Sequence, residues 1–326
     1  MTPSPHTAAP DRPEFSGSVV VVGSINMDIA VTCARLPLPG ETLLADSLLR
    51  SGGGKGANQA VGASRAGGAR TAMVGAVGHD GDGTTLLADL RADGVDVDAV
   101  VRLDLPTGTA LITIDSHAEN TIVVAAGANA AVEVDESAAA TIATADVLLA
   151  QLEIPQEAVL AAARARRPGA LFILNAAPSA PLPEELLAQV DLLIVNEHEA
   201  LDLASVTDLE TALTWLVART PAVLVTLGAA GSRLLRRDIP DIVVDAPEVQ
   251  AIDTVAAGDT FCGVLAAWLA QGSSEPEAMR AASAAASLAV QRHGAQASVP
   301  TRVETLQQVR QVYSRTGVDQ DSPARG

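Results

Sequence analysis

Short runs of consecutive apolar residues, each followed by a turn or polar residue, recur along the chain. The first is Val-Val-Val-Val at residues 19–22, which is closed by Gly23. Because a strand that is covered on both faces needs no polar side, such runs predict buried strands of a parallel sheet. We expect strands at residues 19–22, 71–77, 147–150, 171–174, 192–195 and 223–227.

Alanine-rich segments with apolar residues at helical spacing separate these runs. They cover residues 57–66, 84–92, 155–166, 209–219, 261–270 and 277–292. Strands that alternate with helices indicate an α/β fold, here a doubly wound and mostly parallel sheet that is flanked by helices.

Two regions, residues 27–50 and 108–125, break this alternation. Residues 110–114 and 121–124 form short segments joined by a polar turn at 115–120. They predict a small antiparallel sheet outside the main one, placed as a lid over the strand ends, where open α/β sheets bind ligands. On periodicity alone, an edge hairpin without a gating role is an equal alternative.

Composition and charge exclude several classes of protein. The chain has 326 residues, 48% of them hydrophobic, which suffices for one large domain. We place it at residues 18–313, between a Pro-rich leader at 1–17 and a tail at 314–326, both expected to be disordered. No apolar run reaches the roughly 18 residues that span a bilayer. The 39 acidic and 21 basic residues leave a net charge of −18, which disfavours nucleic acid and membrane surfaces as partners.

The two cysteines, Cys33 and Cys262, are far apart and have no C-x-x-C spacing. This argues against a disulfide framework or a structural zinc site and fits a reducing compartment. We therefore expect a cytoplasmic protein.

The only lysine of the chain, Lys55, lies in the run Gly-Gly-Gly-Lys-Gly at 52–56. The run fits G-x-G-x-x-A only formally, because it follows a lid-like segment and has no suitable acidic residue downstream. It also fails the P-loop pattern, since Gly56 and not Ser or Thr follows Lys55. We interpret it as a turn whose N–H groups and lysine approach a polar ligand, with Asn58 at the start of the next helix. A plain turn is the less favoured alternative.

A second motif, at residues 253–261, places Ala256, Ala257 and Gly258 just before an apolar helical pattern. A helix N-terminus with such small residues exposes unpaired N–H groups, which suits an anion. A carboxylate in the first turn, Asp259, can accept a proton from a hydroxyl that attacks a bound phosphate. Alone, this residue would be read as an ordinary helix cap.

Further polar residues follow the predicted strands. Asn196 and Glu199 lie one helical turn apart and either organise Mg²⁺ or form a capping box, with about equal weight. The small residues of 225–231 suit a loop beneath a nucleotide or a tight hairpin turn. The segment 26–28 and Glu153 also come directly after strands, which makes them binding candidates.

Together and in this order, these motifs resemble the PfkB family of carbohydrate kinases in its ribose-phosphorylating form. The similarity runs from about residue 19 to residue 313. Residues 53–60 are similar to the first family signature and residues 253–261 to the second. The resemblance implies ATP-dependent phosphorylation of D-ribose at its 5-hydroxyl, with ATP, Mg²⁺ and K⁺ as cofactors and a homodimer formed through the lid sheet.

The resemblance also implies roles for individual residues. Asp259 is the expected catalytic base, and the expected anion hole is formed by Ala256, Ala257 and Gly258. The expected sugar-binding residues are Asn26, Met27, Asp28, Gly54, Lys55, Gly56, Ala57, Asn58, Glu153 and Asp259. The expected ATP-binding residues are Asn196, Thr226, Leu227, Gly228, Ala229, Ala230, Gly231, Gly258, Asp259 and Ser283.

Two ion sites are implied as well. The potassium site would use the Asp253 carboxylate, the Ser298 hydroxyl and the carbonyls of Val255, Ala289, Arg292 and Gly294. Asn196 and Glu199 would lie near Mg²⁺ and the phosphates.

Other functions stay open at this point. Kinases for 2-deoxyribose, fructose or a nucleoside are the nearest alternatives, although Lys55 and Glu153 together favour a free pentose. A non-catalytic sugar-responsive binding protein is disfavoured by the intact Asp259 motif. A nicotinamide oxidoreductase is disfavoured by the misplaced glycine pattern.

Overall fold

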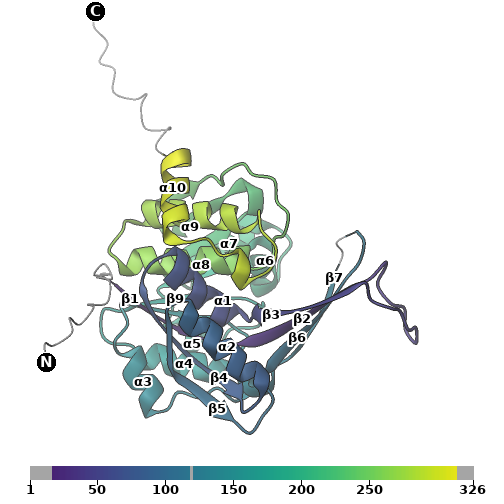
Figure 1. Ribbon diagram of the computed structural model, residues 1–326. Coiled ribbons are helices and arrows are strands. Elements are labelled where there is room, and N and C mark those ends of the chain that lie inside the picture. Colours follow the sequence, from purple (N-terminus) through teal and green to yellow (C-terminus); the bar gives the residue numbers. More distant parts are fainter. Residues whose placement is uncertain (1–16, 118–119, 314–326) are drawn as a thin grey trace, which may run out of the picture.

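The computed structural model describes residues 17–117 and 120–313, in which nine strands form one large sheet and four form a small one. The large sheet has the order β13-β12-β11-β10-β9-β8-β1-β4-β5 (Figure 1). All its pairs are parallel except β11 with β12 and β12 with β13. The leader expected at 1–17, apart from Gly17, and the tail expected at 314–326 lie outside the described residues.

The strands of the large sheet are β1 (Ser18–Val22), β4 (Arg70–Gly78), β5 (Val95–Leu103), β8 (Val147–Ala150), β9 (Leu171–Asn175), β10 (Leu192–Asn196), β11 (Val223–Thr226), β12 (Ser232–Arg236) and β13 (Ile239–Val244). Those of the small sheet are β2 (Asn26–Thr32), β3 (Ser47–Gly53), β6 (Gly108–Ile114) and β7 (Asn120–Ala125).

The α-helices are α1 (Lys55–Val61), α2 (Gly81–Ala92), α3 (Glu136–Ile142), α4 (Gln156–Ala165), α5 (Glu184–Leu187), α6 (Glu197–Ala204), α7 (Leu209–Val217), α8 (Ala257–Ala270), α9 (Glu275–Ala289) and α10 (Arg302–Tyr313). A π-helical turn, Gly62–Ala66, continues α1. No helix of the described residues is long and apolar enough to cross a membrane.

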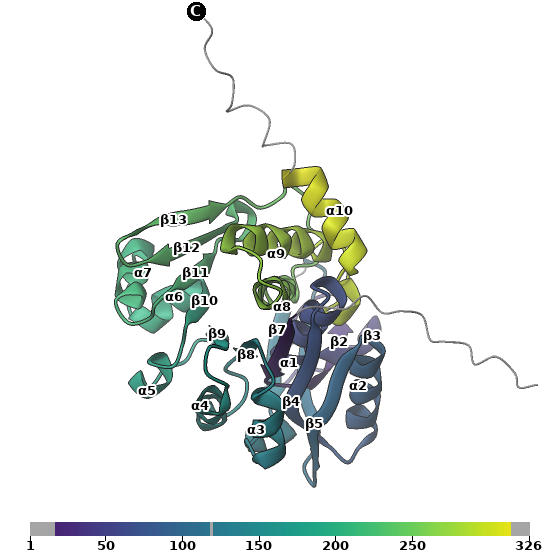
Figure 2. The same ribbon diagram turned by 90° about the vertical axis from the view of Figure 1, so that its left-hand side faces the viewer.

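Alternate side chains of β1 point into two hydrophobic cores, one on each face of the large sheet. Val19 and Val21 pack with residues of α1, α8 and α9, whereas Val20 and Val22 pack with residues of α3, α4 and α7. Figure 2 shows α8 and α9 on one side of the large sheet and α3 to α7 on the other. The predicted α/β fold, with a mostly parallel sheet covered on both faces, is confirmed.

Several elements were not predicted, and each lacks a continuous apolar run or an apolar stripe. The edge strand β5 begins Val-Asp-Val-Asp, with the aspartates exposed and the valines buried. The hairpin of β12 and β13 is connected to β11 by the glycine-containing turn at 228–231. The tight-turn interpretation of that segment therefore describes its backbone. The helix α10 is mostly polar, which hides its periodicity.

The small sheet has the order β3-β2-β6-β7 and extends away from the main body (Figure 1). It is mixed and not purely antiparallel as predicted, because β2 and β6 run parallel. Both strands start at the large sheet, where Asn26 lies opposite Gly108, so both leave it in the same direction. The outer pairs, β2 with β3 and β6 with β7, are antiparallel.

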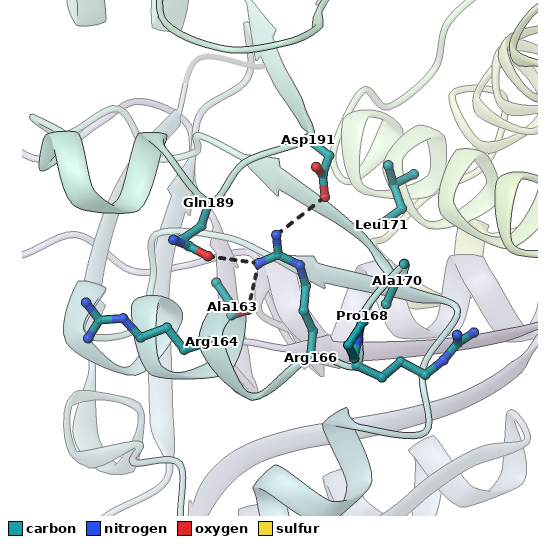
Figure 3. Close-up of a pocket in the computed structure, with 10 residues that line it drawn as sticks. Ala163, Arg164, Arg166, Pro168, Ala170, Leu171, Gln189 and Asp191 are labelled. Atoms are coloured by element: carbon teal, nitrogen blue, oxygen red, sulfur yellow. Dashed lines mark hydrogen bonds and ion pairs between the residues drawn. The ribbon is translucent and has the colours of Figure 1, made fainter.

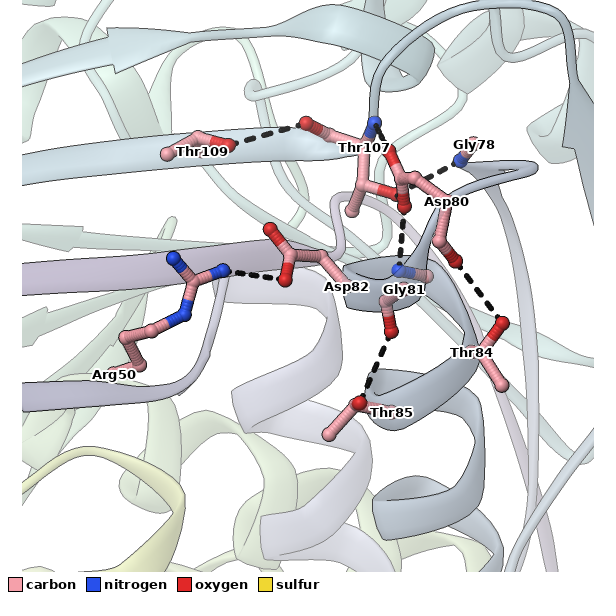
Figure 4. A network of polar contacts seen from close by, with 10 residues as sticks. Arg50, Gly78, Asp80, Gly81, Asp82, Thr84, Thr85, Thr107 and Thr109 are labelled. Carbon is pink, nitrogen blue, oxygen red and sulfur yellow. Dashed lines mark hydrogen bonds and ion pairs between the residues drawn. The ribbon is translucent and has the colours of Figure 1, made fainter.

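Polar contacts join the base of this sheet to the N-terminus of α2 (Figure 4). Asp80 caps α2 by accepting the Gly83 N–H at 2.8 Å. The same carboxylate accepts the N–H of Thr107 at 2.8 Å and its hydroxyl at 2.6 Å, just before β6 begins. An ion pair between Arg50 on β3 and Asp82 on α2 adds a second link. These contacts hold the base of the small sheet against the large one.

Gly263 allows α8 to pack against the backbone of α1. A Cβ at this position would lie 2.7 Å from the nitrogen of Ala63 and closer still to the carbonyl oxygen of Gln59. We expect Gly263→Ala to lower the free energy of unfolding by about 1–3 kcal/mol, because the clash outweighs the gain in helix propensity. Urea unfolding measures this change.

The matched control is Gly81→Ala at the first residue of α2, where nothing lies within 4 Å of the added methyl group. We expect this variant to be neutral or slightly stabilised. Equal or higher stability of Gly263→Ala would contradict the packing argument.

Candidate active site

The carboxyl ends of the parallel strands meet the N-terminus of α8 at a cavity of about 210 Å³. Asp259, in the first turn of α8, lines it and is only 7% exposed. Its other lining groups come from α1, from β9 and the loop after it, from β10, α6 and β11, and from α8 and the loop before it. They are Lys55, Asn175, Ala177, Ile194, Val195, Asn196, Glu199, Thr226, Thr254, Ala256, Gly258 and Cys262. The structure thus brings residues of both sequence motifs together.

The glycine-rich turn lies directly against the end of the first strand. Gly54 has φ +88°, a conformation that favours glycine. A Cβ on Gly56 would lie 2.6 Å from the nitrogen of Ser24, and one on Gly53 would clash with the Asp28 carboxylate. The glycines are therefore required for this close approach, as the interpretation of the motif expected.

Glu153 holds this turn from the loop that follows β8. Its carboxylate accepts the backbone N–H of Lys55 at 3.0 Å and the hydroxyl of Ser24 at 2.5 Å. Nearby, Asn129 pairs with the backbone of Ile25 and donates to Asn26 Oδ1 at 2.7 Å. Polar residues that follow the predicted strands 19–22 and 147–150 thus contact one another at this turn.

Two amides of α1 bind the Asp259 carboxylate. Asn58 Nδ2 donates to Asp259 Oδ2 at 3.0 Å, and Gln59 Nε2 donates to Asp259 Oδ1 at 2.9 Å. In the described part of the chain, Asn58 Oδ1 is buried without a hydrogen-bond partner. Such an atom is suited to accept a hydrogen bond from a bound ligand.

The charges around the cavity shift one another's protonation. Burial, together with the charges of Glu153 and Asp259, raises the pKa of Asp28 to about 7. Burial lowers the pKa of Lys55, but Asp259, Glu153 and Glu199 raise it by more, so the net shift is upward. The ammonium group therefore remains charged among these carboxylates.

A second cavity of about 490 Å³ adjoins the first and shares Thr226, Thr254 and Gly258 with it. It is lined by residues of the 228–231 turn, the 246–251 segment, α8 and α9. Of the predicted ATP-binding residues, those lining it are Thr226, Gly228, Ala229, Gly231, Gly258 and Ser283. Leu227 and Ala230 line neither cavity, while Asn196 and Asp259 line the smaller one.

The loop before α8 has an unusual backbone conformation. Ala256 is left-handed, with φ +57°, at the N-cap of the helix. A non-glycine residue in this region is uncommon and often occurs at functional sites. The first turn of α8 faces the smaller cavity with Ala256, Gly258 and Asp259 among its lining residues.

Asn196 and Glu199 form a capping box at the start of α6. The Glu199 N–H donates to Asn196 Oδ1 at 2.9 Å, and the Asn196 N–H donates to Glu199 Oε2 at 2.8 Å. Both residues also line the smaller cavity. The structure shows the capping box, which uses the side-chain oxygen of Asn196 and one of the two oxygens of Glu199. The expected position of both residues near Mg²⁺ stays a prediction.

The loops of the expected potassium site are in contact. The Asp253 carboxylate accepts the N–H of Val255 and that of Gly294, both at 2.9 Å. Ser298, which is fully buried, donates to the carbonyl of Ala295 at 2.7 Å. The candidate ligands are all oxygens, which suits a hard cation. Residues 17–117 and 120–313 contain no cluster of three or more His, Cys, Asp or Glu side chains able to hold a metal.

Sequence analysis did not identify Gln59, Gln151 or Asn175, which are buried beside Asp259 and connected to it by hydrogen bonds. Asn175 directly follows an expected strand, a signal that was applied to Asn26 and would have found it. Gln59 lies inside the first motif, but its side chain has no signal of its own.

A larger hollow, of about 520 Å³, lies between the end of α4 and the start of β9 (Figure 3). Three arginines line it, and each faces a carboxylate: Arg164 pairs with Glu185, Arg167 with Asp146, and Arg166 lies 3.8 Å from Asp191. Its position at the amino end of β9 separates it from Asp259. Its size therefore does not make it the candidate site.

Comparison with known proteins agrees with this geometry. Residues 16–302 match the model of the pfkB family carbohydrate kinases. The chain is 39% identical over 300 residues to the ribokinase of Haemophilus influenzae, which covers 89% of this chain and 97% of that protein. It is 40% identical over 306 residues to the bifunctional ribokinase/ribose-5-phosphate isomerase A of Fructilactobacillus sanfranciscensis, and it spans 56% of that longer protein.

A solved structure shows the same fold. The Arabidopsis thaliana ribokinase complexed with ribose and ATP superposes with a TM-score of 0.85 and 34% identity, covering 90% of this chain and 99% of that one. The match of the family model and of relatives at this identity over most of the chain shows the family. The chain belongs to the pfkB family of carbohydrate kinases and is a sugar kinase, a phosphotransferase.

Proposed function

We propose that this kinase transfers the γ-phosphoryl group of ATP to the 5-hydroxyl of D-ribose. Relatives that cover most of the chain are ribokinases, and one similar structure holds ribose and ATP. The observation that carries the proposal is the position of Asp259. It lies at a helix N-terminus, between the polar groups of the glycine-rich turn and a second cavity large enough for a nucleotide.

In this proposal, Asp259 accepts the proton of the attacking hydroxyl. The N–H groups at the start of α8, from Ala256 to Gly258, stabilise the charge of the transferring phosphoryl group. Lys55 adds a positive charge beside them. Little covalent chemistry is required of the protein, because phosphoryl transfer depends mainly on position and charge neutralisation.

Hydroxyls of the sugar would bind to groups around the glycine-rich turn. Asp28 and Glu153 accept hydrogen bonds, and Asn58 presents the buried Oδ1 that has no partner in the described residues. Asn129 donates a hydrogen bond to Asn26 Oδ1. This bond orients the Asn26 amide, so its Nδ2 is the atom that would donate to the sugar. The remaining expected contacts are Met27, Gly54, Gly56 and Ala57.

The 490 Å³ cavity would hold the nucleotide. Its walls are mostly small or apolar, and Phe261 and Val290 lie among them, which suits an adenine ring. Ser283 is the polar group that α9 offers there, together with Ser287. Its small side chain leaves room for the base.

Two ions would complete the site. When bound, Mg²⁺ would neutralise phosphate charge near Asn196 and Glu199, and it requires few direct protein ligands. A potassium ion would be held by Asp253, Ser298 and the neighbouring carbonyls. Asp253 already joins the two loops concerned, so the ion would stabilise the loop before α8 and take no part in the chemistry.

The small sheet would act as a lid and as a dimer interface. It carries exposed apolar side chains, including Leu49 and Val123, each 60% exposed, and Leu48 at 63%. Leu48 and Leu49 are neighbours on β3 and therefore lie on opposite faces, so exposed apolar side chains occur on both faces of the sheet. Exposed apolar surface of this kind is expected to be covered by a ligand or a partner. Closure over the sugar would exclude the water that otherwise hydrolyses ATP.

The first prediction concerns Asp259. We expect Asp259→Asn to lower kcat for ribose by about 10²–10⁴-fold and to keep sugar binding, because only the proton acceptor is lost. A coupled assay with ATP and Mg²⁺, with and without potassium, measures turnover over a panel of ribose, 2-deoxyribose, fructose and nucleosides, and calorimetry measures binding.

The control is Asp98→Asn, an exposed carboxylate on β5, which should behave as wild type. Wild-type turnover in Asp259→Asn would refute the assigned base. Phosphorylation of a non-pentose alone would refute the ribose assignment and leave the sugar kinase standing.

The second prediction concerns pH. With its pKa raised to about 7, Asp28 is protonated in the free enzyme below that pH. A sugar that donates hydrogen bonds to the carboxylate favours the charged form, so binding should weaken as the pH falls below 7 and should release a proton. Calorimetry in two buffers of different ionisation enthalpy measures this release.

Asp28→Asn is the reference, since it should remove the pH dependence between pH 5 and 7. The stability of the free enzyme should change in the opposite sense. The raised pKa contributes stability below the ordinary value of 3.8, and this contribution is lost as the pH rises through 7. Binding independent of pH in this range would contradict the role of Asp28.

The third prediction concerns Lys55. We expect Lys55→Arg to reduce kcat/KM for the sugar by roughly tenfold or more, because a planar guanidinium does not replace a compact ammonium in a small cavity. The free energy of unfolding should change by less than about 1 kcal/mol. Steady-state kinetics and urea unfolding measure the two quantities.

The matched control is the reverse exchange Arg50→Lys in the exposed ion pair with Asp82. We expect little effect on either quantity there. A loss of kcat/KM that follows a loss of stability in Lys55→Arg would contradict a specific role of the ammonium group.

A further inference from the structure

Three buried amide side chains form a chain of hydrogen bonds that ends on Asp259. Gln151, directly after β8, donates from Nε2 to Gln59 Oε1 at 2.6 Å. Gln59 Nε2 donates to Asp259 Oδ1 at 2.9 Å and to Asn175 Oδ1 at 3.0 Å. Both glutamines are 0% exposed. Of the described residues, Gln59 and Gln151 are not among those that line either cavity.

The direction of these bonds is determined by their chemistry. A carboxylate only accepts hydrogen bonds, so Gln59 must turn its NH₂ group toward Asp259. One hydrogen of that group binds Asp259 and the other binds Asn175, which uses both donors. The Gln59 oxygen is then opposite, where the NH₂ group of Gln151 binds it. A reversed Gln59 would place its oxygen against two acceptors and its NH₂ group against a donor.

The bond from Gln59 constrains the torsion on which proton transfer depends. The terminal torsion of an aspartate is broad, so a carboxylate that nothing holds would rotate over a range of angles and displace the accepting oxygen. Asn58 binds Oδ2 and Gln59 binds Oδ1, so each oxygen of Asp259 has its own donor. Asn58 is a proposed sugar contact, whereas Gln59 approaches from the buried side. The two amides therefore have different effects on binding and turnover.

We infer that Gln59 is a positioning residue for phosphoryl transfer, which holds the Asp259 carboxylate through a hydrogen bond, while Gln151 binds the opposite end of the Gln59 amide and supports it there. The inference rests on the proposed function, in which Asp259 is the base. Gln59 lines neither cavity and reaches the site through its hydrogen bonds to Asp259 and Asn175. Its loss should therefore lower kcat and leave the KM for ribose and ATP nearly unchanged.

The test compares Gln59→Met, Gln151→Met and the control Gln271→Met. Gln271 is also a hydrogen-bonded glutamine, which binds the carbonyls of Gly67 and Ala267 near the far end of α8. We expect kcat to fall roughly 10- to 100-fold in Gln59→Met and less in Gln151→Met, where Gln59 keeps its bond to Asp259 and loses only the donor to its own oxygen. Both KM values should stay within about twofold of wild type in these two variants. Gln271→Met should keep the wild-type kcat.

A third variant, Gln59→Glu, keeps the shape of the side chain and also serves if Gln59→Met does not fold. At low pH the new carboxyl is protonated, and its O–H donates to Asp259 as the amide does. At higher pH it ionises and repels Asp259, so kcat should decline on the alkaline side in this variant only. A purely structural role would not produce this limb.

The other ionisable groups that interact electrostatically with Asp259 are Asp28 on β2, Lys55 on α1, Glu199 on α6 and Cys262 on α8. They are present in wild type as well, so the wild-type pH profile is the reference. Wild-type kcat in Gln59→Met, or the absence of the alkaline limb in Gln59→Glu, would overturn the inference. If Asp259→Asn itself kept full turnover, the proposed function would fail first and independently.

Discussion

The site is organised by a buried carboxylate, Asp259, in the first turn of α8. Asp259 is removed from water, and a charge in such a place requires hydrogen-bond donors. The two amides of α1 supply them, and the helix N-terminus favours the negative charge. This requirement brings α1 and α8, two elements about 200 residues apart, into direct contact beside β1.

Small residues make that contact possible. Gly263 in α8 lies against the backbone of α1, and Gly56 lies against Ser24 at the end of β1. The same scarcity of bulky side chains runs through the core, since aromatic residues make up only 2% of the chain. The site is therefore held in place by backbones that approach closely and not by large side chains. Polar amides fill the space that remains.

The acidic groups of the site differ in their pKa values and in their hydrogen bonds, and therefore in what each can do. Asp259, Glu153 and Glu199 act on Lys55 and raise its pKa, so its ammonium group stays charged. Burial and the charges of Glu153 and Asp259 raise the pKa of Asp28 to about 7, while Glu153 is occupied by the turn that it holds. In an acidic protein with a single lysine, this arrangement places that lysine where it can partly offset the charge of the surrounding carboxylates.

The fold class and the two motifs could be predicted from the sequence. Continuous apolar runs identify buried strands, because burial on both faces leaves no polar alternation, and a glycine run around a lone lysine needs no structure to be noticed. The sequence did not determine β5, β12 or the parallel pairing of β2 with β6. These elements and pairings depend on which strand lies at the edge of a sheet, and that is defined only once the sheet has assembled.

Which side chains bind one another at the site could be learned only from the folded structure. Asn196 and Glu199 matched two interpretations equally well, and the distances show a capping box at the cavity wall. Gln59 and Gln151 have no local signal, since a buried amide chain is defined by partners that are far apart in sequence. Local sequence patterns indicate which residues are buried and where the chain turns. Hydrogen bonds between residues far apart in sequence are defined only after the elements that carry them have packed together.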